Sequence, residues 1–396
     1  ILHGSREFNF TAFTGSTYSI QNLVVSEIDE GYTDASGLGN FHYEPPTGFS
    51  ALHTNNLDTP AISDPGEHFR CTVYKGTGSA RGITGIGFKP DLVWCKSRTN
   101  TEGQILFDSP RGQESRHLVH TNTTEATATG GLMSFDDDGF SVGQYTGTNA
   151  GGQYYAAWCW KGGGPTVPNT DGDIPTQISV NQTAGFSTGT YSGNLQPNQG
   201  IGHGLGKVPS MVVVKERNAN SGWAVYHKSR GYTKVSYWNA PDTEYTETGT
   251  GASWAEQDPT SDVFYVGANG ATNDNNLSFW AWAEVPGFSR FGAYIGNNDT
   301  NGPHIWCGFK PAYVMLKLVT GQNRDWHVYD SVRNSTNPIG LNLRPSATTG
   351  DTNEPGLDLT STGFKIRQNY FFSNGDGETI IYAAFAESPF QTANAK

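Results

Sequence analysis

Residues 87–111 read GFKPDLVWCKSRTNTEGQILFDSPR, and the outline of this stretch returns twice later in the chain of 396 residues. The second copy reads GKVPSMVVVKER followed by WAVYHKSR, and the third reads GFKPAYVMLKLV followed by WHVYDSVR. Two markers fix the spacing, the opening proline and the closing arginine: Pro90, Pro209 and Pro311, and Arg111, Arg230 and Arg333. The prolines lie 119 and 102 residues apart and the arginines 119 and 103. Because independent markers give nearly equal offsets, we predict three tandem units of roughly 100 residues each.

Each unit is expected to consist of short strands. The run Leu92 to Cys95 after the opening proline is apolar and too short for a helix. The closing run, Tyr154 to Trp160 in the first unit, alternates bulky and small residues, so its rings should share one face and pack across a sandwich. Gly, Pro, Asn, Asp and Ser separate the runs. We therefore predict an all-β chain of tandem antiparallel β-sandwich repeats, of jelly-roll or lectin-like type.

The markers also predict the domain boundaries. We expect a partial adaptor segment at 1–68, repeats at 69–163, 177–286 and 287–396, and a flexible, glycine- and proline-rich linker at 164–176. The chain begins at Ile1 rather than at methionine, so we expect a fragment of a longer polypeptide.

Composition excludes several classes of protein. The net charge is −12, and the 25 basic residues are scattered, which argues against nucleic acid as a partner. The sequence contains no apolar run of the length that a transmembrane helix needs, so no membrane insertion is expected. Four cysteines without CxxC spacing are expected to be buried free thiols, formed in a reducing compartment: Cys71, Cys95, Cys159 and Cys307.

The most prominent polar element is an aspartate or histidine three residues before an arginine. It occurs as Asp108/Arg111, His227/Arg230 and Asp330/Arg333. Such an arginine could bind a sugar acid, or it could hold its own turn closed. Because every copy of a fold needs the same latch, whereas a binding site is seldom needed in triplicate, we predict a structural latch. Histidine in the second unit weakens the ion-pair form of the latch there.

Aromatic residues that recur in all three units are expected to fill the cores. Those outside the repeat pattern are the candidate glycan contacts, because loops on a rigid sandwich usually carry recognition. The candidates are Tyr237, Trp238, Trp254 and Tyr370.

No catalytic residue, metal site or cofactor is predicted. The loops Asp136 to Gly139 and Asn169 to Asp173 have the oxygen-rich composition of calcium loops, but they lack the closing glutamate and fit ordinary turns. The dispersed histidines lack the spacing of a zinc site, and no GxSxG motif is present. The alternative of a glycan-degrading enzyme would need paired carboxylates, for which Glu256, Glu284 and Glu387 are the candidates.

The blocks GFKPDLVWCKSR, LFDSPRG, SFDDDGFSVG, YYAAWCWKGG and GHGLGKVPSMVVVKER resemble a repeated domain of unknown function in bacteriophage structural proteins, especially marine and cyanobacterial ones. The resemblance covers about residues 69–389, and Phe41 to Leu57 resembles the end of the SPRY-like domain that often precedes such domains. It brings no catalytic residues.

The resemblance implies a virion protein, and we expect a tail fibre or other appendage that attaches to the host. The alternatives are a capsid decoration or head-fibre protein and a glycan-degrading tailspike. It further implies a place on the virion surface after assembly in the host cytoplasm. The implied partners are other virion proteins, two further copies of the chain in a fibre-like trimer, and a glycan or protein of the host surface.

Overall fold

The computed structural model describes residues 31–51, 53–57 and 59–392. The chain divides into two compact units, Ile1–Thr59 and Pro60–Lys396. In the first unit, Asp34 organises the described loop by accepting hydrogen bonds from the backbone N–H groups of Ser36, Leu38 and Ala51 and from the Asn56 amide. These hydrogen bonds lower the pKa of Asp34 to about 2, and the bond from the Leu38 N–H has the largest effect. The first 30 residues of the predicted adaptor segment lie outside the described part of the chain.

The second unit is built from antiparallel sheets. We call residues 69–163 the first segment, 177–286 the second and 287–392 the third. The main sheet of the first segment has the order β1 (Phe69–Lys75), β9 (Tyr154–Trp160), β3 (Leu92–Ser97), β4 (Ile105–Asp108), β5 (Ser115–Leu118), β6 (Ala126–Thr127). A smaller sheet has the order β2 (Arg81–Thr84), β8 (Gly139–Val142), β7 (Leu132–Asp136).

The second and third segments repeat this order of strands. The main sheet of the second segment begins with β10 (Val167–Asn169) from the preceding stretch 164–176 and continues with β11 (Thr176–Asn181), β12 (Phe186–Ser192), β19 (Asn276–Trp282), β14 (Met211–Glu216), β15 (Ala224–His227), β16 (Lys234–Tyr237) and β17 (Tyr245–Thr246). Separately, β13 (Gln199–Gly202) pairs with β18 (Val263–Val266). In the third segment one sheet runs β20 (Ser289–Ile295), β27 (Thr379–Pro389), β22 (Phe309–Leu318), β23 (His327–Asp330), β24 (Ile339–Leu343), β25 (Thr352–Thr360), β26 (Gly363–Ile366), β21 (His304–Trp306).

The remaining described elements are short helices. Three are single α-helical turns, one in each segment, and three are 3-10 turns: α1 (Thr146–Asn149), α2 (Gly270–Asn273), α3 (Phe371–Asn374), η1 (Thr54–Asn56), η2 (Pro65–Glu67) and η3 (Phe390–Thr392). In the part of the chain that the structure describes, no helix has the length and apolar character needed to cross a membrane.

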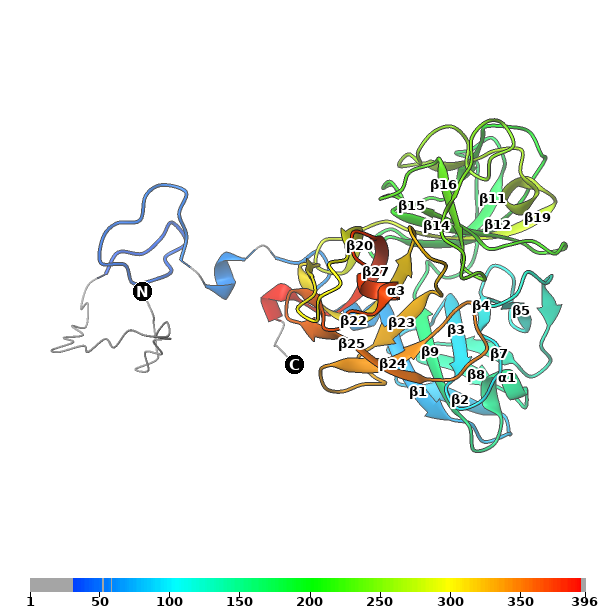
Figure 1. Cartoon of the computed structure of the whole chain (residues 1–396), viewed down its shortest axis with the longest axis horizontal. Coiled ribbons are helices and arrows are strands. Elements are labelled where there is room, and N and C mark those ends of the chain that lie inside the picture. The colour runs from blue at the N-terminus through cyan, green and yellow to red at the C-terminus, as the bar shows by residue number, and fades with distance from the viewer. Residues whose placement is uncertain (1–30, 52, 58, 393–396) are drawn as a thin grey trace. The chain divides into compact units, whose positions relative to one another are not determined.

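Each main sheet has two buried faces. On β3, Val93 and Cys95 belong to the first segment's own core, whereas Leu92 and Trp94 belong to a core that all three segments share. We call the core that all three segments share the common core. The second segment, like the first, also has a core of its own. Figure 1 shows the three segments side by side, in blue to cyan, in green, and in yellow to red.

The common core changes the role of the closing strands. We expected their rings to pack across a sandwich, but Trp158 and Trp160 on β9 point into the common core, while Ala157 and Cys159 line the segment's own core. The Trp160 ring contacts Trp282 at 6.0 Å and Phe385 at 5.5 Å between ring centroids. The expectation was wrong about what these rings pack against. Alternation shows which residues share a face of the sheet, but it does not show which part of the molecule covers that face.

Each segment also carries the same polar staple. Tyr74 on β1 donates its hydroxyl hydrogen to the Thr148 carbonyl at 2.8 Å, and a side chain at Gly76 would place Cβ 2.2 Å from the Ala150 oxygen. The buried Asn149 amide donates to the carbonyls of Ser79 and Gly143. The same contacts recur in the other segments, with Tyr191, Gly193 and Asn273 and with Tyr294, Gly296 and Asn374. The Tyr-x-Gly motif thus fastens the first strand of a segment to its short helix.

Three other predicted features have definite places. The stretch 164–176 contains β10, whose Val167 pairs with Ile178 of β11, so this part of the expected linker extends a sheet. In the two oxygen-rich loops, Asp138 accepts from the N–H groups of Gly85 and Gly87, and Asp173 accepts from that of Gly200. All four cysteines are free and buried.

Candidate functional site

The first and third copies of the predicted latch form buried ion pairs. Arg111 donates from Nε to Asp108 Oδ2 at 2.8 Å, and Arg333 donates from Nε to Asp330 Oδ2 at 2.6 Å. In each copy the arginine's backbone N–H also donates to the other carboxylate oxygen. Both pairs therefore close the turn that follows a central strand.

The same carboxylates also bind a neighbouring segment. Trp280 of the second segment donates its indole N–H to Asp108 at 3.1 Å, and Trp158 of the first donates to Asp330 at 3.0 Å. The guanidinium of Arg111 lies over the Trp280 ring, 5.7 Å from its centroid. We call the contact regions between segments junctions 1–2, 1–3 and 2–3. Each ion pair thus joins two segments as well as closing a turn.

Junction 2–3 lacks both partners of this hydrogen bond. In the first two segments the central strand pairs with these tryptophans, Trp94 with Trp158 and Val213 with Trp280. In the third segment the equivalent residue, Met315, pairs with Ala383. Alanine therefore stands where the other segments have the indole donor. The aspartate position is His227, whose Nε2 lies 3.2 Å from the Tyr382 carbonyl oxygen. A buried aspartate without its indole donor would be poorly satisfied, so the two replacements belong together.

The lysine six residues after each opening proline also crosses a junction. The side chains of Lys96, Lys215 and Lys317 are fully buried. Each donates to a backbone carbonyl of another segment: Lys96 to Thr348 at 2.9 Å, Lys215 to Asn122 at 3.5 Å and Lys317 to Pro241 at 2.9 Å. Burial lowers the pKa of Lys96 and Lys215 to about 8 and that of Lys317 to about 7. The contacts run 1 to 3, 2 to 1 and 3 to 2, which closes a ring.

A second carboxylate strengthens two of the junctions. Glu125 binds Arg111 of its own segment at 3.0 Å and Arg217 of the second segment at 2.8 Å. Asp351 likewise binds Arg333 at 2.8 Å and Arg98 of the first segment at 2.7 Å. These bridges connect junctions 1–2 and 1–3.

At junction 2–3 the corresponding carboxylate is Glu244, which pairs with Arg230 and Lys234 of its own segment. The third segment carries Val319 two residues after its lysine, where the others carry arginine. The six predicted latch residues therefore lie at junctions, and among the described residues junction 2–3 is the one without an indole–aspartate bond and without an arginine of the neighbouring segment on its second carboxylate.

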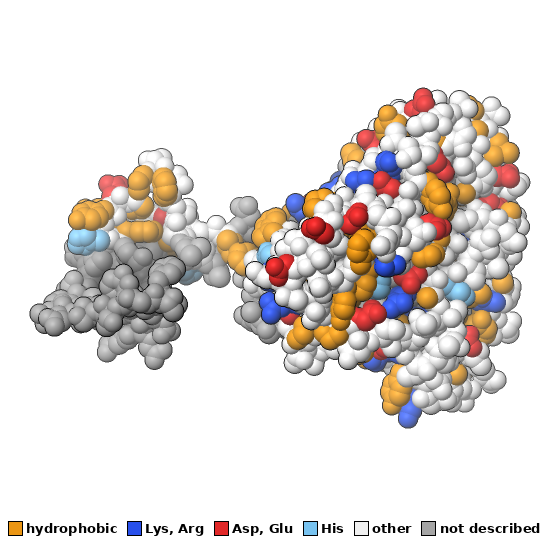
Figure 2. All heavy atoms as spheres, viewed as in Figure 1, with side chains coloured by type: hydrophobic (Ala, Val, Ile, Leu, Met, Phe, Trp, Pro, Cys, Tyr) orange, Lys and Arg blue, Asp and Glu red, His pale blue; other side chains and the backbone are white. Residues whose placement is uncertain are grey.

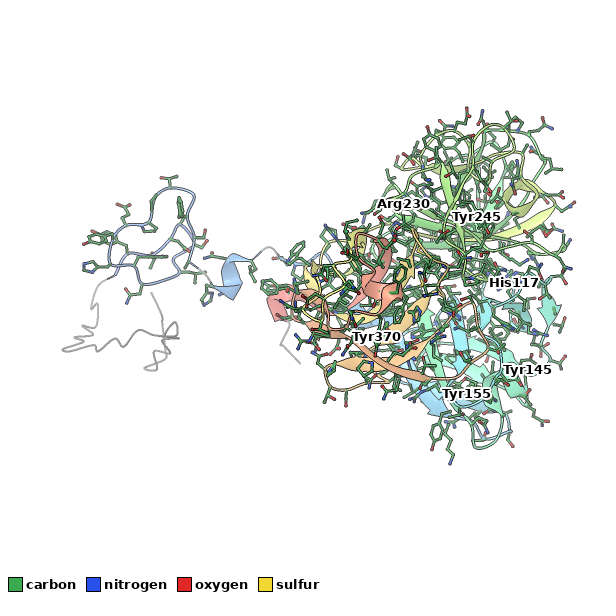
Figure 3. The ribbon with its side chains drawn as sticks, viewed as in Figure 1. His117, Tyr145, Tyr155, Arg230, Tyr245 and Tyr370 are labelled. Atoms are coloured by element: carbon green, nitrogen blue, oxygen red, sulfur yellow. The ribbon has the colours of Figure 1, made fainter. Side chains whose placement is uncertain are left out.

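The predicted glycan contacts do not form one surface. Trp238 is only 2% exposed and packs against Trp94 in the common core, and Trp254 is only 3% exposed and packs against Tyr226. Because no ligand in solvent can reach these rings, both are removed from the candidate set. The two tyrosines of the set are half-buried: Tyr237 packs against Tyr245, and Tyr370 stacks on Phe372. Figure 3 labels Tyr245 and Tyr370, which belong to different segments.

The carboxylates that an enzyme would need are held in separate contacts. Glu284 is bridged by Lys228 at 2.6 Å and Arg290 at 2.9 Å, whereas Glu387 pairs with Lys310 at 2.8 Å. Glu256 accepts a hydrogen bond from the Gly249 N–H. Among the described residues, no group of three or more His, Cys, Asp or Glu side chains could hold a metal ion.

Among the surface clefts formed by described residues, we single out two that are large enough for a small ligand; the sequence analysis predicted neither. We call the first the groove; it has a volume of about 500 Å³ and is lined by Lys89, Asp91, Ser109, Gln113, Met133, Ser134, Phe135 and 164–166. The second, of about 360 Å³, lies at junction 1–3 and is lined by residues that include Arg70, Cys71, Ala312, Ser331, Ser335 and Glu387. On the face shown in Figure 2, acidic and basic side chains are interspersed with hydrophobic ones.

Comparison with known proteins gives one family. The sequence model of a domain of unknown function (DUF7483) matches residues 64–389 as a single range that includes all three segments and their junctions. No curated protein and no solved structure matches the chain. The threefold unit as a whole, rather than one segment, therefore corresponds to the family's domain, and the chain belongs to the DUF7483 family.

Proposed function

We propose that this chain is a non-enzymatic structural protein of a bacteriophage virion, part of a tail fibre or other surface appendage that attaches to the host. The observation that carries the proposal is the use of the repeated polar residues. The lysines, the Asp/His-x-x-Arg pairs and the Tyr-x-Gly motifs all hold strands or segments together. Such a chain is a rigid scaffold on which surface loops are available for recognition.

The three segments, in this proposal, are tandem β-sandwich repeats of jelly-roll or lectin-like type around a pseudo-threefold axis. The shared strand order and the closed ring of lysine contacts support this arrangement. A fibre commonly obtains threefold symmetry from three chains, each burying an apolar side against the next. Here the apolar sides are already buried within one chain, so the expected trimer of chains would need another surface. We predict that light scattering gives the mass of a monomer, 42.8 kDa. A mass three times larger would contradict this prediction and support a trimer of chains.

The remaining parts of the proposal concern position and partners. The segment 1–68, with its resemblance to the end of a SPRY-like domain, would connect the unit to other virion proteins. Loops of the three segments would face the host surface. The four buried free thiols fit assembly in the reducing host cytoplasm.

Immunogold labelling of intact virions tests the proposal. Antibodies raised against the whole chain are expected to place gold on the tail or its fibres, and antibodies absorbed with purified protein serve as the control. Gold spread over the head would favour a capsid decoration or head-fibre protein instead. Particles that carry no specific label would overturn the assignment to the virion.

A further inference from the structure

We propose that the groove on the first segment binds a neutral saccharide, one or two sugar rings of a host-surface glycan. The inference rests on the proposed role in host attachment and adds a site and a ligand class to it. The groove's volume of about 500 Å³ lies within the range of about 300 to 1,000 Å³ typical of small-molecule sites.

An apolar floor is the first component of the site. Met133 and Phe135 come from β7, the edge strand of the small sheet. Leu132 pairs with Val142 and Ser134 with Ser141, so Met133 is the extra residue of a β-bulge. A bulge redirects a side chain, and Met133 is 45% exposed. Together with the half-buried Phe135 ring, it offers an apolar surface for the C–H face of a pyranose.

Polar groups of different kinds also line the groove. Asp91 is buried and held in place by the Ser109 hydroxyl at 2.6 Å and the Gly162 N–H at 2.8 Å. The exposed Gln113 amide can both donate and accept, which suits sugar hydroxyls. Lys89 adds one positive charge to the lining, which contains one carboxylate, so the charges in the groove balance. This balance favours a neutral saccharide over an acidic one.

The equivalent positions in the other segments lack this set. Leu92, Met211 and Tyr313 occupy matching places, because they pair with Trp160, Trp282 and Phe385. Each is preceded by a different residue, namely Asp91, Ser210 and Ala312. The position of Gln113, five residues after the latch aspartate, is Ser335 in the third segment, where it lines the cleft at junction 1–3. The third segment therefore provides a matched control.

Saturation-transfer NMR on the full chain tests the site. The probes are the methyl glycosides of glucose, galactose, mannose and N-acetylglucosamine. At least one is expected to receive saturation, and Gln113→Ala should weaken its binding about fivefold, the effect of one lost hydrogen bond. Met133→Ala should weaken binding as well, whereas Ser335→Ala should leave it unchanged. The three changes are at exposed side chains, so the thermal midpoint should stay constant and report intact folding.

Two results would overturn the inference. One is the absence of saturation transfer to every glycoside at millimolar concentration. The other is binding that survives Gln113→Ala and Met133→Ala, or that Ser335→Ala removes, which would place the ligand elsewhere. If no glycoside binds but gold labels the tail, the proposed role in host attachment remains and the saccharide site in the groove is rejected. If a glycoside binds but the virion carries no label, the saccharide site remains and the proposed virion role is rejected.

Discussion

One oxygen atom of Asp108 serves two segments. Its Oδ2 accepts from Arg111 Nε at 2.8 Å and from Trp280 Nε1 at 3.1 Å, and both partners are buried. Sharing one acceptor between a latch and a junction couples the closure of a turn to the docking of a neighbouring segment. The sequence predicted the ion pair from its spacing, but it contained no sign of the indole, which lies 172 residues away.

Asp108→Asn tests this coupling. The change keeps the shape but removes the charge beside Arg111, and we expect a loss of about 3 kcal/mol in the free energy of unfolding, the cost of breaking a buried pair. Urea denaturation measures it. Asp137→Asn, at an exposed acid, is the control and should change stability by less than about 0.5 kcal/mol.

A double-mutant cycle isolates the contribution of the indole. Trp280→Phe removes the N–H donor and keeps a ring in the common core. Combined with Asp108→Asn, it should show a coupling energy of about 1 kcal/mol. Trp282→Phe is the matched control, because the Trp282 N–H has no hydrogen-bond partner among the described atoms. Equal coupling for both tryptophans would contradict the assignment.

His227 should make stability depend on pH. Burial foremost lowers the pKa of His227 to about 4, with Lys228 and Arg230 adding to the effect and the Tyr382 carbonyl opposing it. An unfolded histidine titrates near pH 6.5, so the unfolded chain binds more protons between about pH 6.5 and 4. The stabilising contribution is therefore complete above pH 6.5 and is lost as the pH falls to 4. His227→Gln should reduce the slope of the stability profile in this range by the contribution of one histidine, because burial also lowers the pKa of His117, His203 and His327. Urea titrations measure the slope, and the exposed His42→Gln should leave it unchanged.

At the scale of elements, the first strand of each segment shows how the open edges of the sheets are protected from pairing with another molecule. β1 and β20 are edge strands, whereas β12 is covered by β11. Sheet pairing makes Arg70, Ser187 and Arg290 equivalent. The two arginines stand on the open edges, and the serine stands where a further strand is paired. Charged side chains on an open edge discourage pairing with another molecule.

Replacing the edge arginines should therefore promote self-association. We expect Arg70→Thr and Arg290→Thr to increase the fraction of large species in light scattering at high protein concentration. Ser187→Thr should have no such effect, because β11 already occupies that edge. Unchanged scattering for both arginine variants would show that other features protect the edges.

At the scale of the whole unit, the three junctions differ in their polar ties. Each junction has one equivalent backbone hydrogen bond from an N–H group to a carbonyl oxygen of the next segment. Its length is 2.7 Å from Glu125 to Arg217 and 2.8 Å from Asp351 to Arg98. At junction 2–3 the bond from Glu244 to Val319 is longer, at 3.3 Å.

Among the described residues, junction 2–3 also lacks the indole–aspartate bond and an arginine of the third segment on Glu244. Its hydrogen bonds from the Trp326 indole to the Tyr237 carbonyl and from Asn323 to Asp242 are not arginine–carboxylate pairs. We infer that it is the first junction to open.

Hydrogen exchange compares the three equivalent amides directly. We expect the Glu244 amide to exchange about 10 to 100 times faster than those of Glu125 and Asp351, as about 1.4 to 2.8 kcal/mol less stabilisation implies. Amides at the centre of β3 and β14 serve as the reference for global unfolding. Equal protection at the three positions would mean that the apolar common core alone sets the opening energy.

Spacing and alternation in the sequence were enough to predict the short strands and the pairs Asp108/Arg111 and Asp330/Arg333. These features rest on local spacing and on period-two alternation, which neighbouring residues decide among themselves. The sequence also correctly placed the four cysteines inside.

The residues that each sheet face and side chain contacts depend on how the segments pack against one another. Trp158 and Trp160 could have faced either core, and Trp238 could have been a surface residue, until the segments packed together. The lysines, the indole donors and the groove depend on residues far apart in sequence, and such contacts leave no periodic signal. Alternation fixes which residues share a face, but the burial of apolar area between whole sheets fixes where that face lies.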